Sequence, residues 1–315
     1  MVELMPAPAR TNGMRRLLLV TALLAISATA TFAQANRGRP LILLVHGRGM
    51  LGRDTMLTRQ MWLDGLRAGA TSLSKDLTVD EGDLRVVWYA DVLDLASKEG
   101  CDYAATDPRA KRDARTDSNV KQFASFAGAV MSVVSGLSGD NDTSNELRGL
   151  AADASFLSDT RKRCGTEARL ASALELAKSE GRPVILVAHS LGSLIAYDYL
   201  STRSDTGLVQ RLVTIGSPVG APEMRHFLIG GDSTDKLAMP LSVKDWVNVR
   251  NDRDPFATSL PVGRNIQTSP PADEPDPHEM VGYLRETVTA REILGAWCDA
   301  MRDNRPQGCK EISAK

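Results

Sequence analysis

Ser190 lies in a sequence pattern that suits a catalytic nucleophile. The segment Ala188-His189-Ser190-Leu191-Gly192 has a small residue two positions before the serine and another two positions after it. The apolar run 184–188 precedes the serine, and apolar residues at helical spacing follow over 191–200. A tight turn from strand to helix lifts the serine hydroxyl out of the sheet, and small neighbours let the two backbones approach each other. The start of the helix also supplies backbone N–H groups that can stabilise an oxyanion.

The pattern around Ser190 also fits two other interpretations. A serine at the start of a helix also fits an ordinary N-cap, which needs no catalytic role. The same pattern recurs around Ser179, in Ala177-Lys178-Ser179-Glu180-Gly181. That copy lies at the end of a predicted helix and has no strand before it, so the context favours Ser190.

The elements that must hold Ser190 alternate between strands and helices. Continuous apolar runs are typical of strands that are buried on both faces of a parallel sheet. The expected strands are 41–45, 84–90, 184–188, 208–215 and 245–250, and the expected helices are 54–73 (capped by Asp54), 167–179, 191–200 and 279–298. This order predicts an α/β fold with a mostly parallel central sheet and helices on both faces.

On these residues the chain resembles the α/β-hydrolases, and within them the bacterial lipases and esterases, over most of residues 40–295. Ala188 replaces the first glycine of the commonest elbow, a variant seen among bacterial lipases. Residues 43–49, Leu-Leu-Val-His-Gly-Arg-Gly, look like the first hydrolase strand and its oxyanion loop, and residues 214–218 resemble the Gly-Ser-Pro that ends a later strand in lipases. The resemblance implies that the backbone N–H groups of Arg48 and Leu191 bind the oxyanion. A plain glycine-rich turn is the alternative interpretation of the loop.

The resemblance also implies a triad in the order serine, acid, histidine. The acid is expected in the loop after strand 245–250, where Asp254 is the first choice and Asp252 the runner-up, although either also fits a turn-capping aspartate. Among four histidines, His278 has the expected position, directly before the last predicted helix. It would take the proton from Ser190 and later return it to the leaving group.

These roles imply a serine hydrolase that cleaves carboxylic esters through an acyl-enzyme intermediate. The same triad serves acyltransferases and thioesterases, and a hydrolase-like fold can also be a non-catalytic binding protein. The expected partner is a small-molecule or lipid ester, and the sequence does not fix the oligomeric state.

No cofactor or catalytic metal is expected. The histidines are scattered, no His-x-x-x-His or Cys-x-x-Cys spacing occurs, and no phosphate-binding glycine loop follows a strand. The 38 basic and 39 acidic side chains give a net charge of −1, which offers no electrostatic reason to expect a nucleic-acid partner. With 43% hydrophobic residues, the 315-residue chain can bury a sizeable core.

Residues 1–33 resemble a signal peptide. Arg15 and Arg16 precede the apolar stretch 17–30, and small residues at Ala33 and Ala35 suit cleavage. We therefore expect an exported protein, periplasmic or secreted, with a segment that stays attached and tethers the protein to a membrane as the alternative. In an oxidising compartment thiols can pair. Of the three possible pairings we favour Cys101–Cys164 and Cys298–Cys309, because each pair brackets a compositionally irregular stretch.

Residues 34–315 are expected to form one hydrolase domain in which 91–165 is a cap or lid insertion. This stretch is rich in Asp, Arg, Ser and Gly around an apolar core at 123–137. An apolar helix over the active site would suit an acyl chain or contact with a lipid surface. A helix packed against the sheet is the alternative.

Overall fold

The computed structural model describes residues 38–111, 155–221, 224, 227–228, 237–269, 275–301 and 305–313. The predicted signal peptide (1–33) and the apolar core of the predicted lid (123–137) lie outside the described residues.

Six strands form one sheet in which every neighbouring pair is parallel. The order across the sheet is β2-β1-β3-β4-β5-β6. The strands are β1 (Leu41–Val45), β2 (Leu84–Val87), β3 (Val184–His189), β4 (Val209–Ile215), β5 (Trp246–Asn251) and β6 (Arg264–Thr268). The expected parallel α/β sheet is therefore confirmed.

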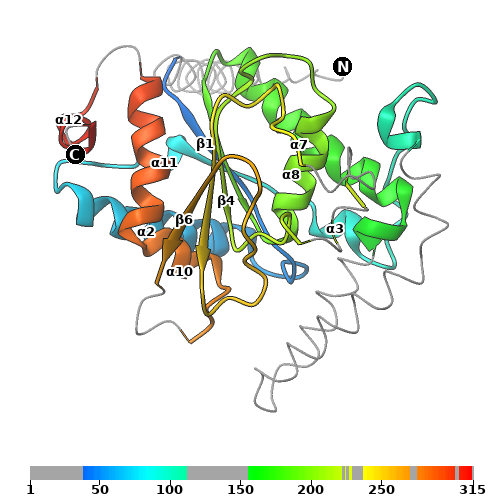
Figure 1. Ribbon diagram of the computed structural model, residues 1–315, viewed down its shortest axis with the longest axis horizontal. Helices are drawn as coiled ribbons and strands as arrows, with labels where there is room; N and C mark the ends of the chain where they lie inside the picture. Colours follow the sequence, from blue (N-terminus) through cyan, green and yellow to red (C-terminus); the bar gives the residue numbers. More distant parts are fainter. Residues whose placement is uncertain are drawn as a thin grey trace, which may run out of the picture. The chain divides into compact units, whose positions relative to one another are not determined.

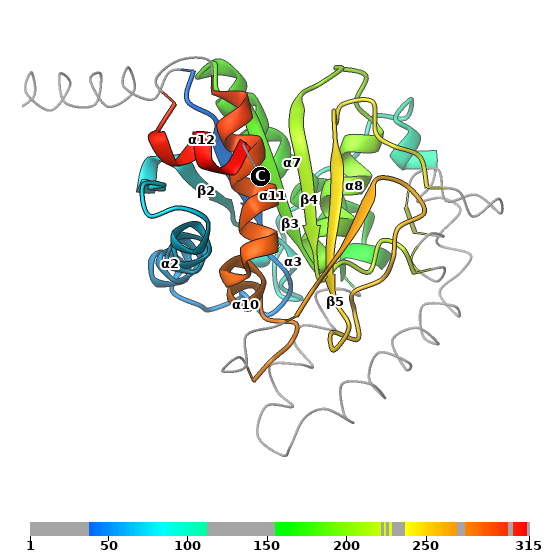
Figure 2. The same cartoon turned by 60° about the vertical axis from the view of Figure 1, so that its left-hand side comes forward.

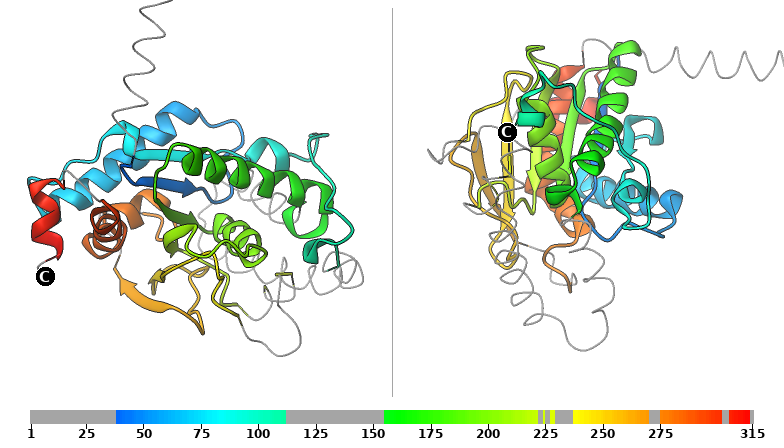
Figure 3. Two further views of the ribbon diagram at one scale, coloured as in Figure 1. Left: turned by 90° about the horizontal axis from the view of Figure 1, so that it is seen from above. Right: turned by 90° about the vertical axis from the view of Figure 1, so that its right-hand side faces the viewer.

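Helices cover both faces of this sheet (Figures 1 and 2). The helices are α2 (Thr55–Leu73), α3 (Ala90–Leu93), α7 (Thr160–Ser179), α8 (Leu191–Ser201), α10 (Met280–Arg285), α11 (Thr287–Ala300) and α12 (Gln307–Ser313), with one 3₁₀ turn, η1 (Glu81–Asp83). Buried residues of α7 and α8 pack on one face, and those of α2, α10, α11 and α12 pack on the other. Figure 3 shows the same arrangement from two further directions.

The strand order explains this division of the helices. Crossovers between parallel strands are almost always right-handed. The chain moves outward from β1 to β2 through α2, and it moves in the opposite direction from β3 to β4 through α8. Helices α2 and α8 must therefore lie on opposite faces. The order reverses between β1 and β3, and ligands of open α/β sheets bind outside the carboxyl ends of strands at such a point.

The side chains of β1 point alternately to the two faces of the sheet, and they divide the core in the same way. Leu41, Leu43 and Val45 of β1 face the α7–α8 side, whereas Ile42 and Leu44 face the α2–α11 side. All five side chains are buried, which is why β1 has a continuous apolar run instead of an alternating one.

Several predicted boundaries were wrong. The predicted helix 279–298 is two helices, because Glu286 between α10 and α11 has extended backbone angles. Strand β6 was not predicted. Strand 84–90 ends at Val87, and α3 begins at Ala90. Helix α7 begins at Thr160, so the last residues of the predicted insertion belong to the helix that leads into β3.

The break at Glu286 allows close packing against α2. A Cβ atom added at Gly69 of α2 would lie 2.6 Å from the Ala290 Cβ and 2.8 Å from the Leu284 carbonyl oxygen, so α2 contacts α10 and α11 at once. The apolar spacing continues on both sides of a one-residue break, and periodicity alone does not reveal it.

Two disulfides join Cys101 to Cys164 and Cys298 to Cys309, the pairing favoured from the sequence. The first ties the segment after α3 to α7, and the second ties the end of α11 to α12. Within the part of the chain that the structure describes, no helix is both long enough and apolar enough to cross a membrane.

Asp54 provides a test of the local folding of α2. Its carboxylate accepts hydrogen bonds from the backbone N–H groups of Met56 and Leu57, at 2.9 and 3.0 Å. We expect Asp54→Ala to lower the free energy of unfolding by about 1 kcal/mol, because two backbone donors lose their acceptor. Urea denaturation would measure this change. Asp54→Asn keeps an acceptor oxygen and should cost less, and equal losses in the two variants would contradict a capping role.

Candidate active site

Ser190 occupies the turn between β3 and α8 with a strained backbone. Its φ of 52° and ψ of −123° make it the one non-glycine residue with positive φ among those described. Such a conformation costs about 1–3 kcal/mol and persists only where its surroundings enforce it. One such contact is the hydrogen bond from the Ser190 N–H to the Ile215 carbonyl, at 3.2 Å.

Glycines let the loop after β1 pack against this turn. A Cβ atom added at Gly192 would lie 2.5 Å from the carbonyl oxygen of Val45, so any larger residue would push α8 away from β1. A Cβ atom added at Gly47 would lie 3.0 Å from the Ser190 Cβ. The predicted oxyanion loop therefore runs directly beside the serine. Arg48 is the next residue of that loop, and Leu191 is the first residue of α8.

His278 lies between Ser190 and Asp254. Its Nε2 atom is 2.9 Å from the Ser190 Oγ, and its Nδ1 atom is 2.9 Å from each carboxylate oxygen of Asp254. These distances permit a proton to pass from the serine to the imidazole. The three side chains come from the loops that follow β3, β5 and β6, so they meet at the carboxyl edge of the sheet.

Asp254 is a buried carboxylate with several hydrogen-bond donors. Its side chain has no exposed surface. It accepts hydrogen bonds from the Phe256 N–H at 2.9 Å and from the Tyr283 hydroxyl at 2.6 Å, in addition to His278. Burial raises the pKa of Asp254. The interactions with His278, Tyr283 and Phe256 together lower this pKa by more than burial raises it, so the pKa lies below the ordinary value. The carboxylate is therefore ionised at neutral pH.

The structure does not bring the runner-up acid, Asp252, into this arrangement. Its side chain is 64% exposed and lies 3.8 Å from the Arg250 guanidinium.

Gly216 closes the site from the end of β4. Its φ is +54°, a value that favours glycine. A Cβ atom added there would lie 2.9 Å from Oδ2 of Asp254 and 3.1 Å from Nδ1 of His278. The next residue, Ser217, is fully buried and donates to the Ser193 hydroxyl, which donates to the Ser190 carbonyl. The segment after β4 thus supports both the serine and the Asp254–His278 pair.

The two histidines on either side of the contact between loop and turn are neutral. Burial lowers the pKa of His46 to about 4 and, with a smaller contribution from the neighbouring His278, lowers that of His189 to about 3. The His46 Nδ1–H donates to the Gly47 carbonyl at 2.7 Å. The His189 Nε2–H donates to the His278 carbonyl at 2.7 Å, so the residue before the serine holds the backbone of the proposed base.

Two nearby residues, Tyr283 and Phe256, and one contact of the Arg48 side chain were not identified from the sequence. Tyr283 contacts Asp254 from α10, five residues after His278. The Phe256 ring centroid is 4.6 Å from that of His278, and the Arg48 guanidinium lies 4.2 Å above the same phenyl ring. In the sequence, only Phe256 could have been identified, because it lies two residues after Asp254 in the same loop.

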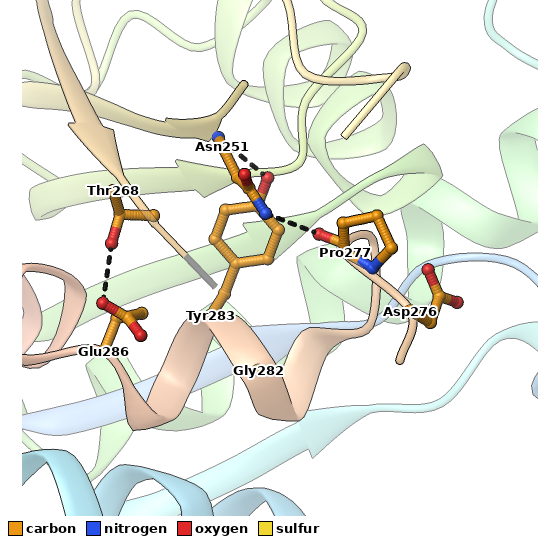
Figure 4. A pocket seen from close by; sticks show the side chains of 7 residues that line it. All are labelled: Asn251, Thr268, Asp276, Pro277, Gly282, Tyr283 and Glu286. Atoms are coloured by element: carbon orange, nitrogen blue, oxygen red, sulfur yellow. Dashed lines mark hydrogen bonds between the residues drawn. The ribbon is translucent and has the colours of Figure 1, made fainter. Parts of the chain in front are cut away.

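A pocket lies between the ends of β5 and β6, the segment before His278, and helix α10. It is lined by Asn251, Thr268, Asp276, Pro277, Gly282, Tyr283 and Glu286, and it includes neither Ser190 nor His278 (Figure 4). It is therefore not the place where a substrate would reach the serine. Within the described ranges, no group of three or more His, Cys, Asp or Glu side chains is arranged to hold a metal ion.

Comparison with known proteins gives one match. A family model described as lecithin:cholesterol acyltransferase matches residues 168–259. The matched segment contains Ser190 and Asp254, and it ends before His278. No curated protein and no solved structure matches the chain. Together with the parallel sheet, this match supports the α/β-hydrolase fold. It does not single out the bacterial lipases and esterases.

The contact between His189 and His278 can be tested without a substrate. We expect His189→Leu to slow the labelling of Ser190 by a fluorophosphonate at least about tenfold, because His278 would lose a backbone hydrogen bond that fixes its position. His189→Gln keeps an N–H donor of similar reach and should restore most of the rate. Mass spectrometry of the labelled protein over time would measure both rates. A leucine variant that folds and labels at the wild-type rate would refute this role of His189.

Proposed function

We propose that this chain is an exported serine hydrolase that cleaves carboxylic esters, of the kind found among lipases and esterases. The observation that carries the proposal is the hydrogen-bonded series Ser190–His278–Asp254 above the carboxyl edge of the sheet. The match of residues 168–259 to a lipid acyltransferase family supports an ester of a lipid as the substrate class.

The reaction would begin with attack of the Ser190 oxygen on the ester carbonyl carbon. The His278 Nε2 atom takes the hydroxyl proton as the new C–O bond forms, and Asp254 stabilises the resulting imidazolium. The N–H groups of Arg48 and Leu191 would stabilise the negative oxygen of the tetrahedral intermediate. The alcohol then leaves with the proton from His278, and Ser190 remains acylated.

Water completes the cycle by the same route. His278 takes a proton from the attacking water, the acyl–serine bond breaks, and the proton returns to Ser190 as the carboxylic acid leaves. If an alcohol replaces water in this step, the product is a new ester. The acyltransferase family match favours this second candidate function, acyl transfer, over the thioesterase and non-catalytic alternatives.

Export is proposed from the N-terminal pattern and from the two disulfides, which form in oxidising compartments. The mature domain would then begin near residue 34, in the periplasm or outside the cell. The lid interpretation of residues 91–165 stays a prediction.

Contact with a lipid surface is proposed through the start of α2. Leu51, Met56, Leu57 and Met61 are 43%, 73%, 62% and 38% exposed, and they follow the oxyanion loop directly along the chain. They make up four of the seven exposed large hydrophobic side chains among the described residues. Such a concentration beside a site marks an interaction surface. A lipid surface that covered these side chains would bring its esters next to Ser190.

The proposed triad predicts that ester hydrolysis depends on the carboxylate of Asp254 and not on that of Asp252. We expect Ser190→Ala to abolish hydrolysis of p-nitrophenyl esters and labelling by a fluorophosphonate. Asp254→Asn should lower kcat by about 10⁴-fold, because the imidazole loses the group that sets its tautomer and stabilises its charge. The exposed Asp252 offers a matched control, and Asp252→Asn should keep the wild-type rate. Full activity of the Ser190→Ala protein would exclude the mechanism.

Testing a series of acyl chains from acetate to palmitate would separate an esterase from a lipase. Adding an alcohol acceptor and measuring the ester product would separate hydrolysis from acyl transfer.

The proposed lipid surface can be tested separately from the chemistry. We expect Met56→Ser/Leu57→Ser to weaken binding to mixed phosphatidylcholine–phosphatidylglycerol vesicles at least about tenfold, since burying one such side chain contributes about 1.5–3 kcal/mol. Hydrolysis of a soluble acetate ester should stay unchanged. Co-sedimentation with the vesicles would measure the binding. The matched control is Leu241→Ser, which changes a 70% exposed leucine ahead of β5, away from the carboxyl edge. Equal binding by all three proteins would contradict the assignment.

A further inference from the structure

Tyr283 joins the proposed catalytic acid to the helix that follows the proposed base. Its hydroxyl donates to Oδ2 of Asp254 at 2.6 Å and accepts a hydrogen bond from the Asn251 N–H at 3.2 Å. Figure 4 shows the second of these bonds and the position of the ring on α10. Tyr283 is 3% exposed, so water does not compete freely for its hydroxyl.

We propose that Tyr283 is a positioning residue for the reaction. Its hydroxyl orients the Asp254 carboxylate toward His278 and sets how strongly that carboxylate attracts the imidazole proton. This inference rests on the proposed function and adds a fourth residue to the three of the triad.

The first argument is geometric. A carboxylate can rotate about the bond to its Cβ, and only a particular orientation presents both oxygens to His278. Phe256 N–H holds Oδ1 and the Tyr283 hydroxyl holds Oδ2, one donor on each oxygen. Both oxygens then lie 2.9 Å from the His278 Nδ1 atom. Without Tyr283, one of the two donors that fix this orientation is lost.

The second argument concerns the protonation state of the hydroxyl. Burial and the neighbouring charge of Asp254 raise the pKa of Tyr283 above its ordinary value. The hydroxyl therefore keeps its proton at any pH at which the enzyme would work. It acts as a donor throughout and never adds a second negative charge beside Asp254.

The charged and titratable groups around the pair come from several elements. The His189 ring lies 4.8 Å from the His278 ring, and it is neutral because its pKa is lowered. The Arg48 guanidinium lies over the Phe256 ring, which in turn contacts the His278 ring. A carboxylate oxygen of Asp276 accepts a hydrogen bond from the backbone N–H of His278 at 2.8 Å. Arg250 acts on Tyr283 through its charge. Removing the Tyr283 hydroxyl leaves all of these groups in place, so an effect on the pair can be assigned to the hydroxyl.

The test is Tyr283→Phe, which removes one oxygen atom and keeps the ring. We expect kcat for a p-nitrophenyl ester to fall about tenfold with little change in KM, because the loss affects proton transfer and leaves binding alone. The acidic limb of the kcat/KM profile should move to higher pH by about half a unit or more. The reason is that the Asp254 carboxylate, with one donor fewer, directs more negative charge at the imidazole and holds its proton to higher pH.

Tyr197 provides a matched control. It is also a buried tyrosine, and its hydroxyl donates to the Ala238 carbonyl at 3.3 Å with no contact to the triad. Tyr197→Phe should keep the wild-type kcat and pH profile, even if it lowers the melting temperature as much as Tyr283→Phe does. If Tyr283→Phe does not fold, 3-fluorotyrosine at position 283 takes its place. Its stronger donor should move the acidic limb to lower pH.

A measurement without substrate separates this inference from the proposed function. The ¹⁵N shifts of the His278 ring, followed against pH, should show a higher titration midpoint in Tyr283→Phe than in the wild type. An inactive wild type that shows this difference would overturn the proposed function and leave the effect of Tyr283 on the pair supported. A folded Tyr283→Phe protein with the wild-type midpoint, kcat and acidic limb would overturn the role of Tyr283.

Discussion

A buried carboxylate that must stay ionised is the constraint around which the carboxyl edge of the sheet is built. Burial of Asp254 favours its neutral form, and three donors offset this effect: the N–H of Phe256, the hydroxyl of Tyr283 and the imidazole of His278. The β5 loop, the loop after β6 and helix α10 must therefore come together before the carboxylate has its partners. Gly216 completes this packing from β4, where any side chain would collide with the acid and the base. A single charge thus links the ends of β4, β5 and β6, which are well separated in the sequence, and the helix α10 that follows the last of them.

The reversal of strand order brings the serine to the same place. Since β1 and β3 are neighbours whose following helices lie on opposite faces, the two loops leave the sheet side by side and then diverge. Gly192 lets α8 approach the backbone at the end of β1, and Gly47 lets the loop after β1 approach the side chains of His189 and Ser190. The proposed oxyanion donors at residues 48 and 191 are backbone N–H groups, so their positions would depend on this packing more than on side-chain rotamers. Groups held in this way need not reorganise as charge develops on a substrate, which is what electrostatic stabilisation of a transition state requires.

The sequence predicts the parts of this arrangement that depend on local pattern. Strand β1 matches its predicted limits because it is buried on both faces and has no polar residue. Strand β6 was missed because Arg264, Asn265 and Gln267 are exposed and leave it without an apolar run; its pairing with β5 identifies it. Asp252 and Asp254 lie in the same loop and share a residue type, so the sequence ranks Asp254 first without excluding Asp252, and burial and hydrogen bonding separate the two. Tyr283 meets Asp254 through tertiary packing of α10, for which no spacing rule exists.

Acid should weaken the fold where the chemistry is proposed. Above about pH 6.5 His46 and His189 are mostly neutral whether the chain is folded or not. Below that pH the unfolded chain binds protons that buried His46 and His189 do not, because their folded pKa values are about 4 and about 3. As the pH is lowered, the free energy of unfolding therefore decreases by about 1.4 kcal/mol per pH unit for each of these two histidines, until the pH approaches their folded pKa values. Asp254 adds to the loss at lower pH, since its lowered pKa stabilises the fold only while the carboxylate stays ionised. His46 and His189 flank the contact between the β1 loop and the turn at Ser190, so their protonation would weaken the packing that holds the proposed oxyanion loop beside the serine.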